Sequence, residues 1–223
     1  GGESDLEARR LRTIGKPTER FGEDHLRLLR AVRFAAQLDF EIEPETFDAA
    51  RELAEKIRAV SAERIRDELL KLFRPPHAAH GLDLLCDSSL MAHVLPELLP
   101  TINCDQSPDY HPEGTVYNHI RLALEKLPAD APATLPWAVL LHDIGKPDTA
   151  SVGADGRIHF YDHEKVGTEM TETILERLRF PRKRIDEITF TVRHHMQFKD
   201  APQMRKATLR RMLLRPTFEL ELE

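Results

Sequence analysis

A histidine and an aspartate stand side by side at the end of a short apolar stretch. The five apolar residues 137–141 run directly into His142 and Asp143, so a buried helix is expected to carry both side chains at its end. An imidazole and a carboxylate are costly to bury together unless something pairs with them, and a metal ion would do so. Gly145 and Pro147 are expected to end the helix, because glycine tolerates the positive φ of a helix-terminating residue and proline cannot continue the helix.

Further histidines occur on the helices expected on either side of this turn. Together with His142 and Asp143, the predicted metal ligands are His119, His163, His194 and His195. If these four helices pack as a bundle, each brings imidazole to one interior point. Any one of these histidines alone would be interpreted as an ordinary surface or core residue, so the set carries the prediction. His159 lies outside the pattern and keeps that ordinary interpretation.

Imidazoles combined with a carboxylate favour a divalent transition metal over calcium, which prefers oxygen ligands. The sequence does not distinguish Mg, Mn, Ni, Fe, Co and Zn. Such an ion suits phosphoester hydrolysis, because it lowers the pKa of bound water and neutralises phosphoryl charge. Lys146, one turn beyond the ligands, is a candidate catalytic residue that would also neutralise phosphate.

A second group of charged residues lies near the amino terminus. Asp24, Arg27, Arg30 and Arg33 recur every three residues, which places them along one stripe of a helix. Arginine and aspartate can hydrogen-bond the edges of bases, and further arginines can hold a triphosphate. The alternative is an ordinary solvated face of an amphipathic helix.

The composition is that of a globular chain. It has 223 residues, of which 41% are hydrophobic and 31% charged, with a net charge of −6. This balance argues against disorder and against a surface that coats nucleic acid uniformly. No apolar run is long enough for a membrane helix and no signal peptide opens the sequence, so a cytoplasmic location is expected. Cys86 and Cys104 lack a CxxC spacing and are expected to be reduced thiols.

Helical periodicity dominates, so the predicted fold is all-α: a helical domain over residues 1–105, followed by a metal-binding helical bundle over 106–223. Residues 101–114 are expected to form a loop between the two. A short hairpin is predicted around Gly153 and Gly156, beside the metal site. The predicted helices are 25–38, 44–60, 62–73, 77–86, 89–99, 115–127, 133–144, 163–179 and 182–196.

The histidine pattern resembles the HD superfamily of metal-dependent phosphohydrolases over residues 111–198. The matching residues are His119, His142-Asp143-Ile144-Gly145-Lys146, His163 followed by Gly167, and His194-His195. The resemblance implies an all-α fold whose metal is held by His119, His142, Asp143 and some of the three later histidines. A later aspartate usually adds a ligand in this superfamily, and Asp200 is the candidate.

The amino-terminal stripe resembles the neck of class II tRNA nucleotidyltransferases (CCA-adding enzymes) and bacterial poly(A) polymerases, over residues 5–73. Its Glu23-Asp24-x-x-Arg27 matches the family motif that selects the incoming base. By this resemblance Asp24 and Arg27 recognise the base, Arg30 and Arg33 contact the nucleotide or phosphate, and the partners are ATP, CTP and the 3′ end of tRNA or another RNA. Arg64 and Glu68 of the following motif are expected to pair at i, i+4 and to hold this helix.

In this family a catalytic head with paired metal-binding carboxylates precedes the neck, and nothing in the 223 residues matches it. Nucleotidyl transfer needs two metal ions held by such carboxylates. The sequence therefore predicts a fragment that carries base selection, RNA support and an HD metal site, with an RNA-binding tail cut short after Leu214. Two alternatives stay open: a free-standing HD phosphohydrolase acting on nucleotides or cyclic phosphates, and a non-enzymatic RNA-binding module with a structural metal.

Overall fold

The computed structural model describes residues 2–154 and 156–215, and of residues 198–200 only the backbone. The chain divides into two compact units, Gly1–Leu99 and Pro100–Glu223. In the described part the regular structure is mainly helical and each sheet has only two strands, which confirms the predicted all-α class. None of the helices formed by these residues combines the length and the apolar character needed to cross a membrane.

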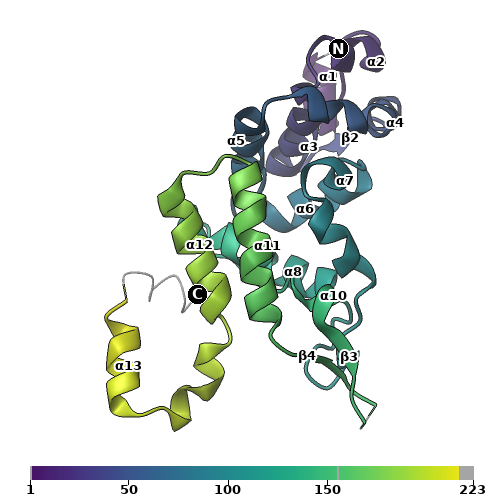
Figure 1. Ribbon diagram of the computed structural model, residues 1–223. Helices are drawn as coiled ribbons and strands as arrows, with labels where there is room; N and C mark the ends of the chain where they lie inside the picture. The colour runs from purple at the N-terminus through teal and green to yellow at the C-terminus, as the bar shows by residue number, and fades with distance from the viewer. Residues whose placement is uncertain (1, 155, 216–223) are drawn as a thin grey trace. The chain divides into compact units, whose positions relative to one another are not determined.

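The first unit is a set of short helices with one two-stranded parallel sheet (Figure 1). Its elements in chain order are α1 (Gly2–Glu7), β1 (Arg10–Leu11), α2 (Pro17–Glu23), α3 (Leu26–Leu38), β2 (Glu41–Ile42), α4 (Pro44–Glu52), the 3-10 helix η1 (Ala54–Ala59), α5 (Ala62–Leu72), α6 (Ala78–Asp87) and α7 (Met91–Val94).

Helix α3 is the centre of the first unit, because it packs on both α5 and α6. Its apolar face includes Leu28, Val32 and Ala36, all of them fully buried. These residues recur every four positions, as expected of the core-facing stripe of a helix. On the same helix Arg27 is partly exposed and Arg30 exposed, whereas Arg33 is buried, so the charged stripe runs from the surface into the interior.

Two predicted helices of this unit are interrupted. The helix expected over 44–60 ends at Glu52 and continues as the 3-10 helix η1, whose tighter turn places Ile57 in the core. The helix expected over 89–99 is limited to α7, because Pro96 lacks the amide that would continue it. A 3-10 helix, η2 (Pro96–Asn103), follows.

The second unit contains the helices on which the predicted ligands lie. Its elements are α8 (Val116–Glu125), α9 (Leu135–Leu141), α10 (Lys146–Thr149), β3 (Ala150–Val152), β4 (Ile158–Phe160), α11 (His163–Arg177), α12 (Arg182–His194), the 3-10 helix η3 (Gln197–Gln203) and α13 (Lys206–Leu213).

The long helices α11 and α12 lie side by side (Figure 1). Helices α12 and α8 each pack on α9. Helix α9 is the centre of this unit, with Trp137, Leu140 and Leu141 buried. The Trp137 ring meets Phe180 edge to face, with centroids 4.8 Å apart. Strands β3 and β4 form the predicted antiparallel hairpin. The four helices of the predicted bundle, α8, α9, α11 and α12, are thus connected by packing, with α8 and α12 on α9 and α11 on α12.

Candidate metal centre

The His142-Asp143 pair lies where the buried helix α9 ends. His142 is the C-terminal cap of α9, and Asp143 is 2% exposed. The predicted positive φ at Gly145 is wrong, because its φ is −82°. The prediction that Pro147 helps to end α9 is also wrong. Pro147 lies in the first turn of the next helix, α10, where its missing amide needs no partner.

Gly145 is required for a different reason, which is the close approach of α11. A Cβ at this position would overlap the carbonyl oxygen of His163 and lie 2.6 Å from the amide nitrogen of Gly167. Both neighbours are backbone atoms that cannot move aside independently. The absence of a side chain at Gly145 thus lets the first turn of α11 bring His163 against Asp143.

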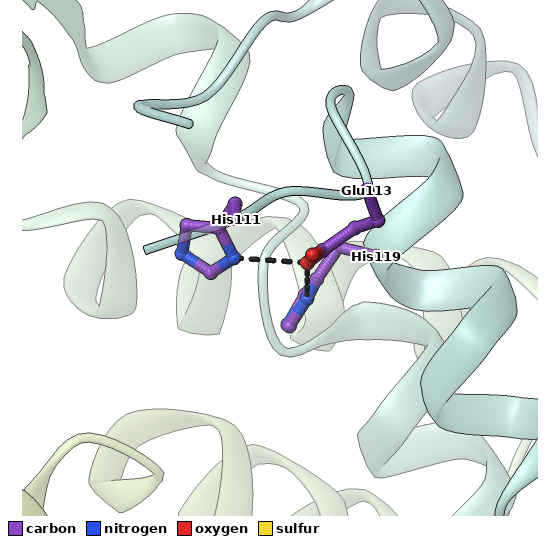
Figure 2. Close-up of side chains that lie close together, drawn as sticks. All are labelled: His111, Glu113 and His119. Atoms are coloured by element: carbon purple, nitrogen blue, oxygen red, sulfur yellow. Dashed lines mark hydrogen bonds and ion pairs between the residues drawn. The ribbon is translucent and has the colours of Figure 1, made fainter. Parts of the chain in front are cut away.

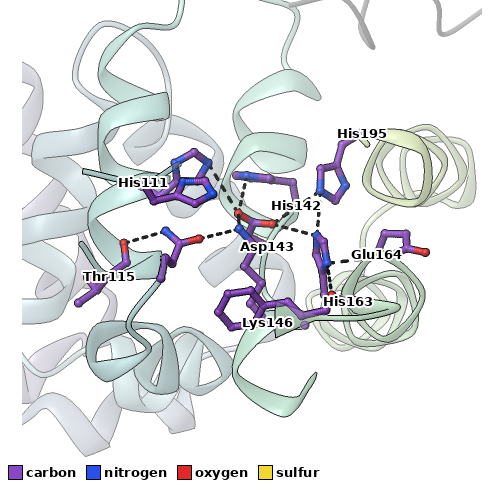
Figure 3. A network of polar contacts seen from close by, with 12 residues as sticks. His111, Thr115, His142, Asp143, Lys146, His163, Glu164 and His195 are labelled. Atoms are coloured by element: carbon purple, nitrogen blue, oxygen red, sulfur yellow. Dashed lines mark hydrogen bonds and ion pairs between the residues drawn. The ribbon is translucent and has the colours of Figure 1, made fainter. Parts of the chain in front are cut away.

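Imidazoles from four elements converge on the Asp143 carboxylate (Figure 3). The Nε2 atoms of His142 and His119 lie 3.1 and 3.7 Å from its Oδ2 atom. The Nε2 atoms of His163 and His195 lie 3.3 and 3.6 Å from its Oδ1 atom. These residues come from α8, the end of α9, the start of α11 and the end of α12. Potential ligands that are far apart in the sequence thus share one interior point.

The outer nitrogens of the same imidazoles are held by oxygen atoms. The Nδ1 atoms of His142, His163 and His195 each lie 2.7 Å from the backbone carbonyl three residues earlier. The Nδ1 atom of His119 lies 2.6 Å from the carboxylate of Glu113. Because these oxygens can only accept, each Nδ1 carries a proton, and in its neutral form each ring presents the lone pair of its Nε2 atom.

Lone pairs that face one another need a cation between them. The Nε2 atoms of His163 and His195 are 3.2 Å apart, and with both Nδ1 atoms protonated neither Nε2 can donate to the other. A divalent metal, or a proton shared within the cluster, removes the repulsion. The donor set therefore fits a metal of the type that binds imidazole and carboxylate.

Glu113 and His111 extend the cluster and were missed by the sequence analysis. Glu113 accepts hydrogen bonds from Nδ1 of His111, at 3.0 Å, and Nδ1 of His119 (Figure 2). Both residues lie in the irregular segment before α8, where no periodic pattern identifies them. The one available signal was a carboxylate in the loop leading to a helix that carries a predicted ligand.

Lys146 is buried against the predicted ligands. The residue is 6% exposed, and its ammonium group lies 2.7 Å from Oδ2 of Asp143 and 2.6 Å from the side-chain oxygen of Gln106. The Phe160 ring lies 5.4 Å from the same nitrogen. The residue expected to meet a phosphate group thus contacts the carboxylate in this structure, and a catalytic role stays a prediction.

The ionisable groups of the cluster strongly affect one another's pKa values. Burial would raise the pKa of Asp143, but His142, His163 and His195 hold it well below its usual value. Burial would lower the pKa of His142, but the Asp143 carboxylate raises it. Burial and the neighbouring His142 lower the pKa of His119. At neutral pH Asp143 is therefore ionised and His119 neutral, the forms that bind metal.

The pKa of Glu113 is lowered to about 2. Partial burial would raise it, but its own backbone amide and the hydrogen bonds from His111 and His119 outweigh that effect. The carboxylate is thus charged throughout the neutral range and orients the His119 ring.

The remaining predicted site residues lie elsewhere. His194 is not in any potential metal-binding group among the described residues. Its Nδ1 atom faces the carbonyl oxygen of Phe190, and its ring packs on the ring of that residue. The side chain of Asp200 lies outside the described residues. His159, which was given no role, lines the same pocket as Asp143, a cavity of about 610 Å³.

In the first unit, Asp24 is the C-terminal cap of α2 and Arg27 lies in the first turn of α3. One Asp24 oxygen accepts from the Leu26 amide and the other lies 3.0 Å from the Arg64 guanidinium. Burial raises the pKa of Asp24, but these two hydrogen bonds hold it below its usual value. Arg27 contacts the Glu23 carboxylate at 2.6 Å. Both predicted base-recognising side chains are therefore held in place while remaining partly exposed.

The third stripe arginine belongs to the interior. Arg33 is 9% exposed and its Nε atom lies 2.6 Å from the buried Glu68 carboxylate, which Arg30 also approaches at 3.6 Å. The expected pairing of Arg64 with Glu68 is replaced by pairs that join Arg64 to Asp24 and Glu68 to α3. These two residues of α5 do hold α3, but across the interface between the helices.

Two family models match the chain. One, described as the probable RNA and SrmB-binding site of polymerase A, covers residues 39–101, and the HD domain covers 109–216. An A-adding tRNA nucleotidyltransferase of Deinococcus radiodurans is 38% identical over 88% of this chain and 46% of its own length. A CC-adding tRNA nucleotidyltransferase of Thermus thermophilus is 37% identical over 96% of this chain and 50% of its own length.

Among solved structures, the CCA-adding enzyme of Bacillus stearothermophilus in complex with CTP is similar, with a TM-score of 0.61 and 27% identity. The match covers 91% of this chain and 41% of that one. The chain thus spans about half the length of the relatives it matches.

Proposed function

The chain belongs to the family of CCA-adding tRNA nucleotidyltransferases and poly(A) polymerases, and we propose that it supplies base selection and RNA support together with an HD metal site. Relatives named for A addition and for CC addition are similar over 88% and 96% of this chain. In the whole protein the substrates are ATP, CTP and the 3′ end of tRNA. Residues 1–105 carry the first role and residues 106–223 the second.

Base selection is assigned to Asp24 and Arg27. The observation that carries this assignment is that each polar end is oriented by a fixed neighbour, Arg64 for Asp24 and Glu23 for Arg27. An amide-anchored carboxylate beside a guanidinium presents acceptors and donors to the edge of a base. Arg30 is the further contact to the nucleotide, whereas Arg33 acts by fixing α3 to α5.

Arg27→Ala in the full-length protein tests base selection. The expected result is loss of discrimination among the four nucleoside triphosphates, measured as incorporation into a tRNA lacking its 3′ end. Arg58→Ala is the matched control, because Arg58 is an exposed arginine of the same unit. Unchanged selection in Arg27→Ala would rule out the assignment.

In the second unit, His119, His142, Asp143, His163 and His195 hold a divalent metal at a phosphoester-hydrolysing site. The convergence of four imidazoles on one buried carboxylate supports this proposal. When bound, a divalent metal supplies a coordinated water of lowered pKa and neutralises charge on phosphoryl oxygens.

The residues of the chain itself prepare the site for that chemistry. Asp143 remains ionised through its histidine neighbours, and Glu113 holds His119 in the tautomer whose Nε2 atom is unprotonated. Lys146 offsets part of the Asp143 charge at 2.7 Å. The cavity of about 610 Å³ beside these groups provides room for a phosphoester.

Metal analysis of the purified protein and of His142→Ala tests the site, with His77→Ala, in the other unit, as control. We expect bound divalent metal in the wild type and in His77→Ala and its loss in His142→Ala, together with phosphoester hydrolysis that disappears in Asp143→Ala. Absence of metal from all three proteins would refute the proposal. Bound metal with RNA binding that depends steeply on salt, and no hydrolysis, would instead favour a structural metal.

A further inference from the structure

Two aromatic side chains of the β3–β4 hairpin are stacked at the wall of the metal-site pocket. The rings of His159 and Tyr161 have centroids 5.3 Å apart and planes 11° from parallel. They are two residues apart, the spacing at which side chains of an extended segment share a face. Tyr161 is 71% exposed although it lines the pocket. One broad face of this aromatic pair is thus accessible to solvent.

The pair lies close to the predicted metal ligands along the chain. Tyr161 is two residues before His163, whose Nε2 atom is 3.3 Å from Asp143. Two residues span at most about 7 Å between their Cα atoms. The aromatic face and the proposed phosphoester site are therefore near enough for one small molecule to contact both.

The hairpin is anchored at two points, one before this pair and one between its two residues. The carbonyl oxygen of Phe160 accepts from Nδ1 of His163 at 2.7 Å. Arg157, at the start of the returning strand, lies 3.2 Å from Asp109 in the loop that precedes α8. That loop also carries Tyr110, a further exposed pocket residue. The aromatic pair is thus attached at fixed points to the segments that hold the metal centre.

We propose that His159 and Tyr161 form a stacking surface for the base of a nucleoside phosphate whose phosphate group lies at the Asp143 site. The inference rests on the proposed phosphohydrolase function and assigns the residues that bind the base of its substrate. A flat, exposed aromatic surface beside a phosphate site suits bases in general, because every base has a π-face and stacking needs no particular hydrogen bond. Free nucleotides and the terminal nucleotide of an RNA share this chemistry.

Binding to the Mn²⁺-loaded protein tests the proposal without relying on turnover. The probes are a hydrolysis-resistant adenosine 5′-phosphonate and methylphosphonate, which differ by the presence of the nucleoside. The wild type is expected to bind the nucleoside probe more tightly. Tyr161→Ala is expected to reduce that preference roughly 5- to 100-fold, the range of one base–aromatic stack, whereas Tyr161→Phe should keep it. Val152→Ala is the matched control, because this exposed hairpin residue does not line the pocket.

The outcomes separate this inference from the function on which it rests. Equal affinity for the two probes, or a preference unchanged in both Tyr161→Ala and His159→Ala, would overturn the stacking surface while leaving a phosphate-binding metal site intact. Failure of the wild type to bind metal and either probe would refute the phosphohydrolase proposal itself, and the inference with it. Circular dichroism of each variant verifies that the fold is retained.

A short oligoribonucleotide with a 3′-terminal phosphate identifies the source of the base. Its displacement of the nucleoside probe supports an RNA end as the natural ligand, and displacement by AMP alone supports a free nucleotide. Either displacement result requires that the base stacks on His159 and Tyr161.

Discussion

The ammonium nitrogen of Lys146 lies 2.7 Å from Oδ2 of Asp143, in a position where both side chains are buried. The carboxylate predicted to bind a metal thus already has a cationic partner within the chain. Removal of one member of a buried ion pair leaves the other uncompensated, which costs about 3–5 kcal/mol. A bound metal would offset that loss.

Lys146→Met is therefore expected to lower the thermal stability of the metal-free protein and to increase the stabilisation produced by Mn²⁺. Thermal unfolding with and without Mn²⁺ measures both effects. Lys183→Met serves as control, since Lys183 is an exposed lysine of α12. A variant whose Tm responds to Mn²⁺ no more than the wild type would show that Lys146 does not compete with the metal for Asp143.

Glu113→Ala is expected to weaken metal binding about 10- to 100-fold, because the carboxylate orients the His119 ring through its Nδ1 atom. Titration with Mn²⁺, followed by calorimetry, measures the dissociation constant. Glu125→Ala is the comparison, since Glu125 is exposed on the same helix as His119. Equal Mn²⁺ affinities of the two variants would show that Glu113 does not support the metal site.

His194 and His195 are neighbours in sequence with different expected effects. The Nε2 atom of His195 lies 3.6 Å from Asp143, whereas the ring of His194 packs on Phe190. We expect His195→Ala to lose bound metal and His194→Ala to keep it, as measured by elemental analysis. Metal loss in His194→Ala alone would contradict the arrangement.

Gly145→Ala is expected to destabilise the second unit by about 1–3 kcal/mol, because the added Cβ overlaps backbone atoms of α11. Urea unfolding measures the change. The matched control is Gly22→Ala in α2, where a Cβ meets no atom within 4 Å and alanine suits a helix better than glycine. Similar stabilities of the two variants would refute the close-approach explanation.

Glu68→Gln is expected to destabilise the protein by about 3–5 kcal/mol at neutral pH, because it leaves Arg33 buried without its charged partner. Burial raises the pKa of Glu68, but Arg33 and Lys71 outweigh this and hold the pKa below its usual value. The unfolded chain therefore binds this proton more tightly than the folded chain. The contribution of Glu68 is complete above the unfolded pKa of about 4.3 and is lost as the pH falls through the folded value.

The difference in unfolding free energy between wild type and Glu68→Gln should accordingly shrink as the pH falls below about 4. Glu63→Gln, on an exposed position of the same helix, supplies the reference for unspecific acid effects. A difference independent of pH would show that the Glu68 charge does not stabilise the fold.

The predicted and observed helix bounds agree well where the sequence contains one strong local pattern. The helix predicted over 25–38 forms as Leu26–Leu38, because its apolar residues follow the helical period. Agreement was poor where tertiary packing determines the backbone conformation. At Leu53 the helix changes to a 3-10 helix, although no proline or glycine in the sequence indicates a break there. The expected Arg64–Glu68 pair failed for the same reason, since both side chains found partners across the helix interface.

The sequence by itself determined the residue types of the metal centre and their order along the helices, because adjacent His142 and Asp143 at the end of an apolar run are a local pattern. Only the tertiary structure decided which neighbours join them. His195 rather than His194 reaches Asp143, Glu113 orients His119 from a loop, and Lys146 contacts the carboxylate. The physical reason is that side-chain direction depends on how helices pack, and a close approach such as that of Gly145 to Gly167 is invisible in sequence spacing.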